Sequence, residues 1–544
     1  MDSTISAAAP ARRATEAPER ATRSLVEALR SPGCYPHAVE RVEVVETHIS
    51  FVLLAGEHAY KIRKPVRLAF LDFSTLEARR RDCEEELRLN RRTAPQLYLD
   101  VVRITGTAAS PVVGGTGPAI EYAVRMRRFD QDLLFDRLAR AGRLGAPDVD
   151  ALARAVARFH GEAARADAGS GYGTPERVLA DALDNFHDIE ARENAEARLR
   201  ILDDLREWTL AEHHALAPLL AERHVDGFVR ECHGDLHLGN VVRLDGAPVL
   251  FDALEFDPRL RWIDVMSEAA FVVMDLERRG FAGLAARFLN GWLEESGDYP
   301  GLRLLRFYAV YRAMVRAKVA CIRAHEPGLD AAARAEAERE LASYLALARR
   351  LAHRARPALI LMHGLSGSGK TSVAQRLLEA FGAVRVRSDV ERKRRHGLEP
   401  AARSRSSPGA GLYTSREDRL TYARLAELAS WVLASGYPAI VDATFLRRAD
   451  RDAFRALASA AGASYTIADC VASDRALRAR LARRASGGTD ASEADLAVLE
   501  LQRSRAEPLA RDEAAHAVAF DTEDEEGMRE ACTAVARRLR PMRH

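Results

Sequence analysis

The segment from Gly364 to Thr371 reads Gly-Leu-Ser-Gly-Ser-Gly-Lys-Thr and follows an apolar run over residues 358–362 that is typical of a strand. A strand that leads through a glycine-rich turn into a helix directs several backbone N–H groups at one point, where a polyphosphate fits without meeting a Cβ atom. The pattern predicts an ATP site in which Lys370 binds the β- and γ-phosphates and acts in catalysis, while Thr371 binds Mg2+. The residues predicted to form this P-loop are Gly364, Ser366, Gly367, Ser368, Gly369, Lys370 and Thr371.

A second set of residues that could do chemistry follows a short His-Gly-Asp sequence. An Asp-Gly pair between two apolar runs predicts a hairpin, and a three-residue loop centred on Gly246 would place Asn240 directly opposite Asp252. Cross-strand partners lie close together, so two oxygen ligands would face one point, as Mg2+ that holds phosphates requires. Asp235, which precedes Asn240 on the entering loop, could accept a proton from an incoming hydroxyl group. This segment therefore predicts a base and two metal ligands.

The order of these residues resembles the catalytic loop of the aminoglycoside phosphotransferase and choline kinase group of kinase-like enzymes, which reads His-Gly-Asp-x4-Asn. The resemblance covers roughly residues 40–325. It implies a bilobal, protein-kinase-like fold in which Asp235 is the catalytic base and Asn240 and Asp252 bind Mg2+. Two histidines of the loop are favoured as buried hydrogen-bonding groups that support it rather than as catalytic groups: His233 and His237.

Such a kinase also needs a lysine at the ATP phosphates, held by an acidic residue of the next helix. Lys61 ends a predicted strand, and Glu86 lies on the inward face of a helix predicted to reach about residue 92, so we favour this pair. Residues 47–50 stand where a glycine-rich loop would cover the phosphates, and they contain no glycine. The open alternatives are Glu84 or Glu85 in place of Glu86, and Lys64 in place of Lys61.

Two aspartates follow strands that are predicted beyond the P-loop. Asp389 follows the strand 383–387, where a carboxylate points into the ligand crevice of a parallel sheet and could take a proton from a substrate hydroxyl. Asp442 ends the strand 438–442 and could orient the Mg2+ shell as a Walker B carboxylate does. Either aspartate alone could instead cap the following helix. Behind a complete P-loop, the two together favour phosphoryl transfer.

A basic helix and a flexible stretch over residues 486–490 lie further along the chain and suit a closing lid. This region resembles small P-loop kinases of the gluconate kinase, polynucleotide kinase and zeta-toxin type, over about residues 356–540. The resemblance implies that Asp389 is the base or a hydroxyl ligand. It also implies that Arg480 and Arg484 are lid arginines that neutralise charge on the transferred phosphoryl group. A solvated basic helix face is the open alternative.

The run from Arg392 to His396 could bind a phosphorylated or polynucleotide substrate, together with two arginines beyond it, Arg403 and Arg405. Aromatic residues that would stack bases are lacking, with Tyr413 the nearest candidate. A small anionic metabolite therefore suits this run better than RNA or DNA. A nucleic acid remains the less favoured partner of this part of the chain.

The predicted elements that position these residues define the fold class as mixed α+β and α/β in two domains. A small β-rich lobe and a larger helical lobe form a bilobal kinase-like domain, and a P-loop NTPase domain with a parallel sheet follows. The predicted boundaries are a disordered tail over 1–25, the kinase-like domain over 26–330, a helical linker over 331–356 and the ATP-binding P-loop domain over 357–544. The predicted strands of the last domain are 358–363, 383–387, 438–442 and 464–469, and its helices include 370–381, 417–435 and 448–461.

Composition limits the partners of the chain. A length of 544 residues exceeds what one hydrophobic core supports, and a net charge of +2 lacks the imbalance of a general nucleic-acid binder. No stretch approaches the roughly 18 apolar residues of a membrane span, and the six dispersed cysteines indicate neither a zinc site nor a disulfide framework. Because the first residues also lack the apolar region of a secretory signal, we expect a cytoplasmic protein that acts on small molecules, with no membrane partner. The oligomeric state stays open.

The leading hypothesis is a bifunctional ATP-dependent kinase, in which each domain uses ATP and Mg2+ to phosphorylate a hydroxyl group of a small metabolite. Two alternatives stay open. The C-terminal domain could phosphorylate the 5′-hydroxyl group of a polynucleotide, or one domain could bind ATP without chemistry and regulate the other.

Overall fold

The computed structural model describes residues 9–539 except 48, 69–70, 168, 354–356, 401, 403–413 and 488–494. The chain divides into two compact units. The first unit comprises Met1–Leu144, Glu162–Gly173 and Arg223–Glu268, and the second comprises Gly145–Gly161, Thr174–Glu222 and Ala269–His544. These units cross the predicted domain boundaries, since helices that precede residue 331 share the second unit with the P-loop.

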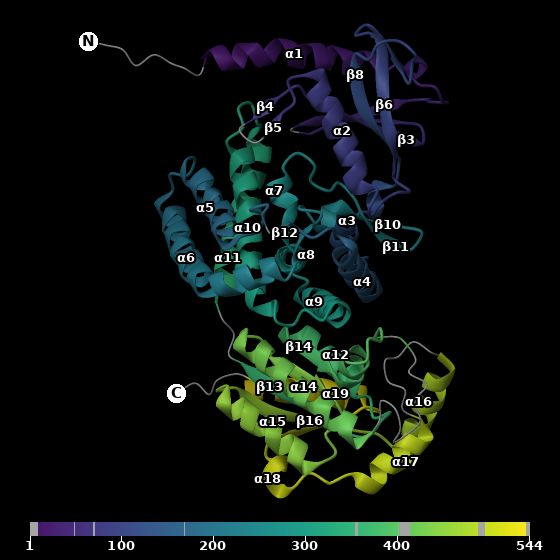
Figure 1. Ribbon diagram of the computed structural model, residues 1–544, viewed down its shortest axis with the longest axis vertical. Helices are drawn as coiled ribbons and strands as arrows, with labels where there is room; N and C mark the ends of the chain where they lie inside the picture. Colours follow the sequence, from purple (N-terminus) through teal and green to yellow (C-terminus); the bar gives the residue numbers. More distant parts are fainter. Residues whose placement is uncertain are drawn as a thin grey trace, which may run out of the picture. The chain divides into compact units, whose positions relative to one another are not determined.

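A six-stranded antiparallel sheet with strand order β1-β2-β3-β8-β6-β7 dominates the beginning of the first unit (Figure 1). Successive strand residues face opposite sides, so Phe51, Leu53 and Tyr60 lie in a core while Lys61 points to the other face. Helix α2 (Leu76–Asn90) packs against β6 and β8. The strands are β1 (Val42–Glu46), β2 (Ser50–Ala55), β3 (His58–Arg63), β6 (Tyr98–Thr107), β7 (Ser110–Val113) and β8 (Glu121–Arg127).

Helix α1 (Ala9–Ala28) lies against the apolar face of this sheet. Leu25 and Val26 of the helix, and Leu29 just after it, are buried in the core of the sheet. The sequence predicts a disordered tail over residues 1–25. The structure differs from Ala9 onward, because the apolar side chains at the end of the helix gain burial against the sheet.

Short elements complete the first unit and frame the segment that carries Asp235 and Asn240. Strand β9 pairs with β12, and β10 pairs with β11 in a hairpin. The strands are β4 (Arg67–Leu68), β5 (Leu71–Asp72), β9 (Val229–Glu231), β10 (Val241–Leu244), β11 (Ala247–Leu250) and β12 (Trp262–Asp264). The helices are α3 (Phe135–Arg140) and α7 (Pro258–Arg261), with 3-10 turns η1 (Pro32–Cys34), η2 (Gln131–Leu133) and η3 (Leu238–Asn240).

Long helices lead to the P-loop. The helix α11 (Ala331–Ala352) packs along α10 (Leu302–Ala324) and buries Leu341, Tyr344 and Leu345. The segment predicted as a linker is therefore a packed helix over most of its length. The other helices are α4 (Ala146–Glu162), α5 (Pro175–Glu190), α6 (Glu196–Val225), α8 (Val265–Arg278) and α9 (Ala282–Ser296).

Five parallel strands in the order β14-β15-β13-β16-β17 form the sheet of the second unit (Figure 1). Helices α12 and α19 pack on one face, α14 and α15 on the other, and Ile360 and Met362 meet Leu377 in one core. The predicted fold class is thereby confirmed. The strands are β13 (Ala358–His363), β14 (Val384–Arg387), β15 (Ala439–Asp442), β16 (Ser464–Val471) and β17 (Ala517–Asp521). The helices are α12 (Lys370–Phe381), α13 (Ser388–Arg394), α14 (Ser415–Ala434), α15 (Arg448–Ala460), α16 (Asp474–Gly487), α17 (Leu496–Arg505), α18 (Arg511–Ala514) and α19 (Glu525–Leu539).

Helix α9 covers the β14 edge of this sheet within the second unit. The side-chain amide of Asn290 donates to the carbonyl of Ala383 at 2.8 Å and accepts from the N–H of Arg385 at 2.6 Å. One turn later, Glu294 accepts hydrogen bonds from the guanidinium groups of Arg385 and Arg387. Since a buried strand edge needs partners for its backbone groups, α9 is part of the folded unit around the P-loop.

We expect Asn290→Ala to lower the free energy of unfolding, measured by urea denaturation, by about 3 kcal/mol, because it leaves a buried N–H and a buried carbonyl unpaired. Asn290→Asp keeps the acceptor for Arg385 but directs a buried carboxylate oxygen at the carbonyls of Ala286 and Ala383. Because an unpaired buried charge is costly, this variant should be at least as destabilised as the alanine variant. An alanine variant within about 0.5 kcal/mol of the wild type would show that α9 does not complete this edge.

Candidate active sites

Lys61 joins the first sheet to helix α2 and to the segment after the β10–β11 hairpin. Its Nζ donates to Oε1 of Glu86 at 2.8 Å and to Oδ1 of Asp252 at 2.7 Å. Burial lowers the pKa of Lys61, but the carboxylates of Asp252 and Glu86 outweigh burial and hold this pKa well above its ordinary value. The lysine is therefore cationic at neutral pH and lies between the helix and the predicted metal ligand.

The alternative residues for this pair have other partners. Lys64 donates to Glu46 at 2.6 Å and lies over the ring of Phe51. Glu84 accepts from Arg80, and Glu85 from Arg88. The structure therefore brings Lys61 together with Glu86 rather than with its neighbours in the helix.

The β10–β11 hairpin has a two-residue loop in place of the predicted three-residue loop. Asp245 and Gly246 both have positive φ values, 49° and 78°, which is the turn whose twist matches that of the flanking strands. Asn240 consequently pairs with Phe251, whose N–H donates to the Asn240 carbonyl at 3.0 Å. The predicted opposition of Asn240 and Asp252 is wrong by one residue.

Asp252 reaches Lys61 by leaving the strand with a φ of 62°, a left-handed conformation that costs energy for a residue other than glycine. Its N–H donates to the hydroxyl of Tyr98 at 3.1 Å, and the N–H of Ala253 donates to Asn90 at 2.8 Å. Burial raises the pKa of Asp252, but Lys61 lowers it further, to below its ordinary value. These contacts hold an ionised carboxylate in a strained turn, as functional sites often do.

Asn240 fixes the predicted base. Its Nδ2 donates to the carbonyl of Asp235 at 2.9 Å and to the carboxylate Oδ2 of Asp235 at 3.3 Å. The amide oxygen of Asn240 then has no hydrogen-bond partner among the described residues, as a metal ligand requires. With the carboxylate of Asp252 it supplies the oxygen donors that Mg2+ prefers, so both side chains fit a metal-binding role.

The two loop histidines have the geometry of supporting groups. His233 is buried, which lowers its pKa, and its Nε2 donates to the carbonyl of Phe251 at 2.8 Å. The Nδ1 of His237 accepts from the N–H of Gly239 at 3.0 Å, and its Nε2 lies 3.5 Å from Asp235. These contacts connect the catalytic loop to the hairpin and to the predicted base.

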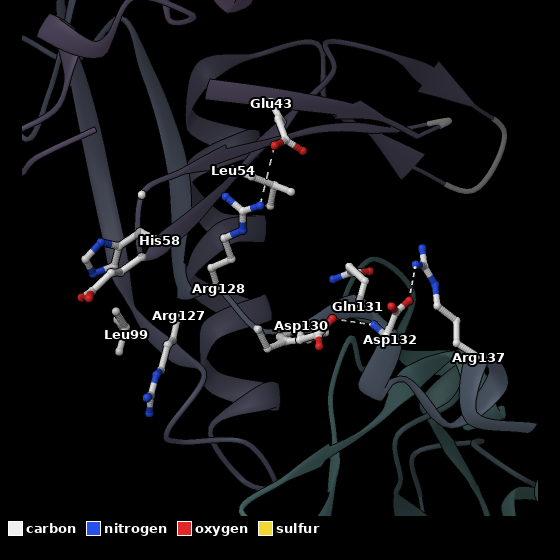
Figure 2. A pocket seen from close by; sticks show the side chains of 13 residues that line it. Glu43, Leu54, His58, Leu99, Arg127, Arg128, Asp130, Gln131, Asp132 and Arg137 are labelled. Carbon is white, nitrogen blue, oxygen red and sulfur yellow. Dashed lines mark hydrogen bonds and ion pairs between the residues drawn. The ribbon is translucent and has the colours of Figure 1, made fainter. Parts of the chain in front are cut away.

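A pocket of about 840 Å³ lies in the first unit, beside the strand that carries Lys61 (Figure 2). It is lined by Leu54 and His58 of the β2–β3 hairpin and by the segment that follows β8, where Arg128 forms an ion pair with Glu43 at 3.8 Å. Lys61 does not line the pocket, but it follows His58 by three residues, about 10 Å along the strand. No pattern in the sequence indicates this pocket, because its polar lining comes from segments distant in the chain.

The P-loop joins the carboxyl end of the central strand β13 to helix α12. The hydroxyl of Thr371 donates to Oδ2 of Asp442, at the end of the adjacent strand β15, at 3.0 Å. Lys370 donates to the carbonyl of Leu365 at 2.8 Å. Gly364 has a φ of 131°, and a Cβ atom there would lie 2.4 Å from a backbone oxygen, so only glycine fits. Thr371 and Asp442 supply oxygen donors of the kind that hold Mg2+ in P-loop enzymes.

A residue that the sequence did not indicate also contacts this loop. The side-chain oxygen of Gln502, on helix α17, accepts from the N–H of Ser366 at 2.8 Å. The pairing joins residues that are far apart in the chain, so neither periodicity nor motif spacing predicts it.

Asp389 lies in the first turn of α13, directly after strand β14. Its side chain is half-buried and has no hydrogen-bond partner among the described residues. Its role toward a substrate hydroxyl stays a prediction.

The side chain of Arg480 contacts the backbone of the P-loop. It donates to the carbonyl of Gly367 at 3.2 Å and to the hydroxyl and carbonyl of Thr522 at 2.8 and 2.9 Å. The arginine therefore connects the loop to the end of β17. The side chain of Arg484 and residues 488–490 of the predicted lid stretch lie outside the described parts of the chain.

The basic run after Asp389 is engaged in ion pairs. Arg392 binds Asp418 at 2.6 Å, and both Arg395 and His396 bind Glu417, on helix α14. Three further residues of this prediction lie outside the described residues: Arg403, Arg405 and Tyr413.

The chain beyond Asp442 is held by a buried ion pair. Arg451 binds both carboxylate oxygens of Glu513, at 2.6 and 2.9 Å, and donates to the carbonyl of Phe445 at 3.0 Å. Phe445 has a φ of 47°, which is strained for a bulky residue. The pair therefore stabilises the strained segment that follows Asp442.

The hydrogen bonds from Arg451 lower the pKa of Glu513 from 4.5 to about 2. A depressed carboxyl pKa stabilises the fold above the unfolded value, and this contribution is lost as pH falls from about 4.5 toward 2. We expect Glu513→Gln to lower the free energy of unfolding at pH 6 by about 3 kcal/mol, at about 1.4 kcal/mol per pKa unit. Urea denaturation at pH 6, 4.5 and 3.5 should show the deficit narrowing below pH 4.5. A deficit independent of pH would contradict this assignment.

The fold and the two sites define a phosphotransferase with a kinase-like domain followed by a P-loop domain. The model of the phosphotransferase enzyme family matches residues 57–305, and that of an AAA domain matches residues 359–509. Families of this kind use ATP with a divalent metal ion. Among the described helices, none is both long and apolar enough to cross a membrane.

Uncharacterized proteins of Mycobacterium tuberculosis and Mycobacterium bovis are 31% identical to this chain over 454 residues, which is 83% of this chain and 88% of theirs. The chain belongs to the same family as these mycobacterial proteins.

Solved structures resemble separate parts of the chain. A gluconokinase from Sinorhizobium meliloti is 24% identical, covers 34% of this chain and 94% of its own, and gives a TM-score of 0.25. A choline/ethanolamine kinase family protein from Mesorhizobium loti is 11% identical, covers 60% of this chain and 99% of its own, and gives a TM-score of 0.34.

Proposed function

We propose that the chain is a bifunctional ATP-dependent kinase whose two sites each transfer the γ-phosphate of ATP to a hydroxyl group of a small molecule. One observation carries this proposal: the described chain holds two separate sets of a lysine and oxygen donors suited to phosphate and a divalent cation. In the first unit, Lys61 binds the carboxylate of Asp252. In the second, Thr371, which directly follows Lys370 in the chain, donates a hydrogen bond to Asp442.

In the first site, the oxygen of the acceptor hydroxyl bonds to the γ-phosphorus, and the bond between this phosphorus and the leaving ADP oxygen breaks. Asp235 accepts the proton of the hydroxyl in this step. Lys61 offsets the negative charge of the phosphates. Asn240 and Asp252 would hold Mg2+, which neutralises charge on the phosphate oxygens when bound. The base of ATP would occupy the pocket beside β3, from which the phosphates extend toward Lys61.

In the second site, Asp389 takes the proton of the acceptor hydroxyl, since it lies at the carboxyl end of the sheet beside the P-loop. Lys370 binds the transferred phosphoryl group, while Thr371 and Asp442 would hold Mg2+. Arg480 keeps the loop in place through the Gly367 carbonyl.

The acceptor of the second site is proposed to be a small molecule rather than a polynucleotide. Three basic side chains of this run already pair with carboxylates of α14, Arg392 with Asp418 and both Arg395 and His396 with Glu417. A nucleic acid backbone would have to displace these pairs, in which Glu417 is half-buried and Asp418 is exposed.

The test is transfer of labelled γ-phosphate from ATP to a panel of sugars, polyols, nucleosides and a short 5′-hydroxyl oligonucleotide by the full-length protein. We expect small-molecule products and no labelled oligonucleotide. A labelled oligonucleotide would support the polynucleotide kinase alternative instead. Nucleotide binding at both sites with transfer from only one would support a regulatory role for the other.

A further inference from the structure

Arg63 lies two residues after Lys61 on β3 and therefore on the same face of the sheet. It is fully buried, and its guanidinium contacts three carboxylates. Nη2 donates to Oε2 of Glu86 at 2.6 Å and to Glu255, and Nε forms an ion pair with Asp82 at 2.5 Å. Glu86 thus binds two cations at once, Lys61 through Oε1 and Arg63 through Oε2.

The same guanidinium reaches the segment that stands in place of a glycine-rich loop. Its Nη1 donates to the hydroxyl of Ser50, the first residue of β2, at 2.9 Å. The N–H of Ser50 in turn donates to the hydroxyl of Thr47 at 3.0 Å. One side chain therefore connects β2, β3, helix α2 and the segment after Asp252, which are the four elements around the proposed phosphate site.

We infer that Arg63 is a positioning residue that holds Glu86, Glu255 and Ser50 so that the Lys61–Glu86 pair is assembled before a nucleotide binds. This inference deepens the proposed function of the first unit and rests on it. Arg63 acts through Glu86, because its guanidinium is buried among the carboxylates. Arg63 is therefore not a catalytic residue. The helix that carries Glu86 then needs no movement to complete the site.

The charges in this cluster show why a cation is required beside Lys61. Burial raises the pKa of Asp82 above its ordinary value and that of Glu255 to about 8, although Arg63 lies beside both. Among the three carboxylates that Arg63 contacts, Lys61 contacts only that of Glu86. Without Arg63, the second carboxylate oxygen of Glu86 would lose its partner, and no cation would hold Asp82 and Glu255 beside it.

A guanidinium suits this role better than an ammonium group. Its planar fork presents donors in several fixed directions, and here they are directed at Glu86, Glu255 and Ser50. A lysine in the same place keeps the charge but not the geometry. The conservative variant Arg63→Lys should therefore restore only part of the function that Arg63→Gln loses.

The experiment uses the full-length chain with Lys370→Ala as the parent, so that nucleotide binding reports the first unit. Affinity for the non-hydrolysable ATP analogue AMP-PNP with Mg2+ is measured by calorimetry, and thermal stability in parallel. We expect Arg63→Gln to weaken binding by about 10- to 100-fold, the usual effect of removing a residue that orients a ligand group. Arg63→Lys should lie between the parent and Arg63→Gln.

Arg79→Gln is the matched control, because Arg79 forms a buried ion pair with Glu121 that also joins α2 to the sheet. It should lower thermal stability as Arg63→Gln does and leave AMP-PNP affinity within about twofold of the parent. If Arg63→Gln does not fold, Arg63→Lys is compared with Arg79→Lys in the same way.

Equal losses of affinity in the Arg63 and Arg79 variants, in proportion to their losses of stability, would overturn the inference, since Arg63 would then be only structural. A parent that binds no AMP-PNP would contradict the proposed function of the first unit itself. These two failures are therefore distinguishable.

Discussion

Lys370→Ala is expected to abolish phosphate transfer by the second unit, with a loss of at least about 100-fold in turnover, as for removal of one charged group that stabilises a transition state. Lys370 follows Gly369 directly at the start of α12, and in the structure its ammonium group donates to the P-loop backbone. No other lysine of the described chain lies on this loop. The measurement is labelled phosphate transfer to the products identified for the second unit, while products of the first unit should form at the wild-type rate.

Arg376→Ala is the control for this variant. Arg376 lies on the same helix but is exposed, and it pairs with Glu525 on the surface. Its removal takes one positive charge from α12 and none from the site, so transfer should change by less than about twofold. Equal losses of phosphate transfer in the two variants would show that transfer depends on the charge of the helix and not on contact between Lys370 and phosphate.

Asp235→Asn is expected to lower turnover by the first unit by about 10²- to 10⁴-fold, the range that general base catalysis contributes. Asparagine has the shape of aspartate but cannot accept the proton of the acceptor hydroxyl. Affinity for AMP-PNP should change by less than about threefold, because Asp235 is proposed to act on the acceptor and not on the nucleotide. Turnover is measured with Lys370→Ala present, so that the second unit does not contribute.

The matched control for this change is Asp245→Asn, in the turn of the β10–β11 hairpin. Asp245 has a φ of 49°, which asparagine tolerates well, and it lies away from the loop that carries Asp235. This variant should keep wild-type turnover. Should Asp235→Asn retain more than about a tenth of the wild-type turnover, proton acceptance by Asp235 would be excluded as a main contribution.

The elements around the P-loop could be predicted closely from sequence, because their signals are local. The strand 358–363 and the helix 370–381 match β13 and α12 residue by residue, since apolar runs and glycines mark their ends. The remaining strands and helices predicted for this part lie within two residues of β14, α14, β15, α15 and β16.

The register of the β10–β11 hairpin could not be predicted from local sequence signals. An Asp-Gly pair is compatible with loops of two or three residues, and the difference moves the partner of Asn240 from Asp252 to Phe251. Asp252 approaches Lys61 only because its backbone adopts a strained conformation, which residue types do not indicate.

Long-range partners are the part of the sites that sequence could not predict. Arg63 is one of many arginines in this chain, and only the fold places it among Asp82, Glu86 and Glu255. The same holds for helix α9, whose Asn290 completes the β14 edge of the P-loop sheet from nearly a hundred residues earlier in the chain.

The most direct test of the central claim, that one chain carries two separate nucleotide sites, is the number of AMP-PNP molecules bound per full-length chain with Mg2+. We predict two molecules for the wild type and one for Lys370→Ala. Lys61→Met should also bind one, because it removes the lysine that binds Glu86 and Asp252 in the other unit. The double variant should bind none. A wild type that binds one molecule, or a Lys61→Met variant that still binds two, would contradict the account.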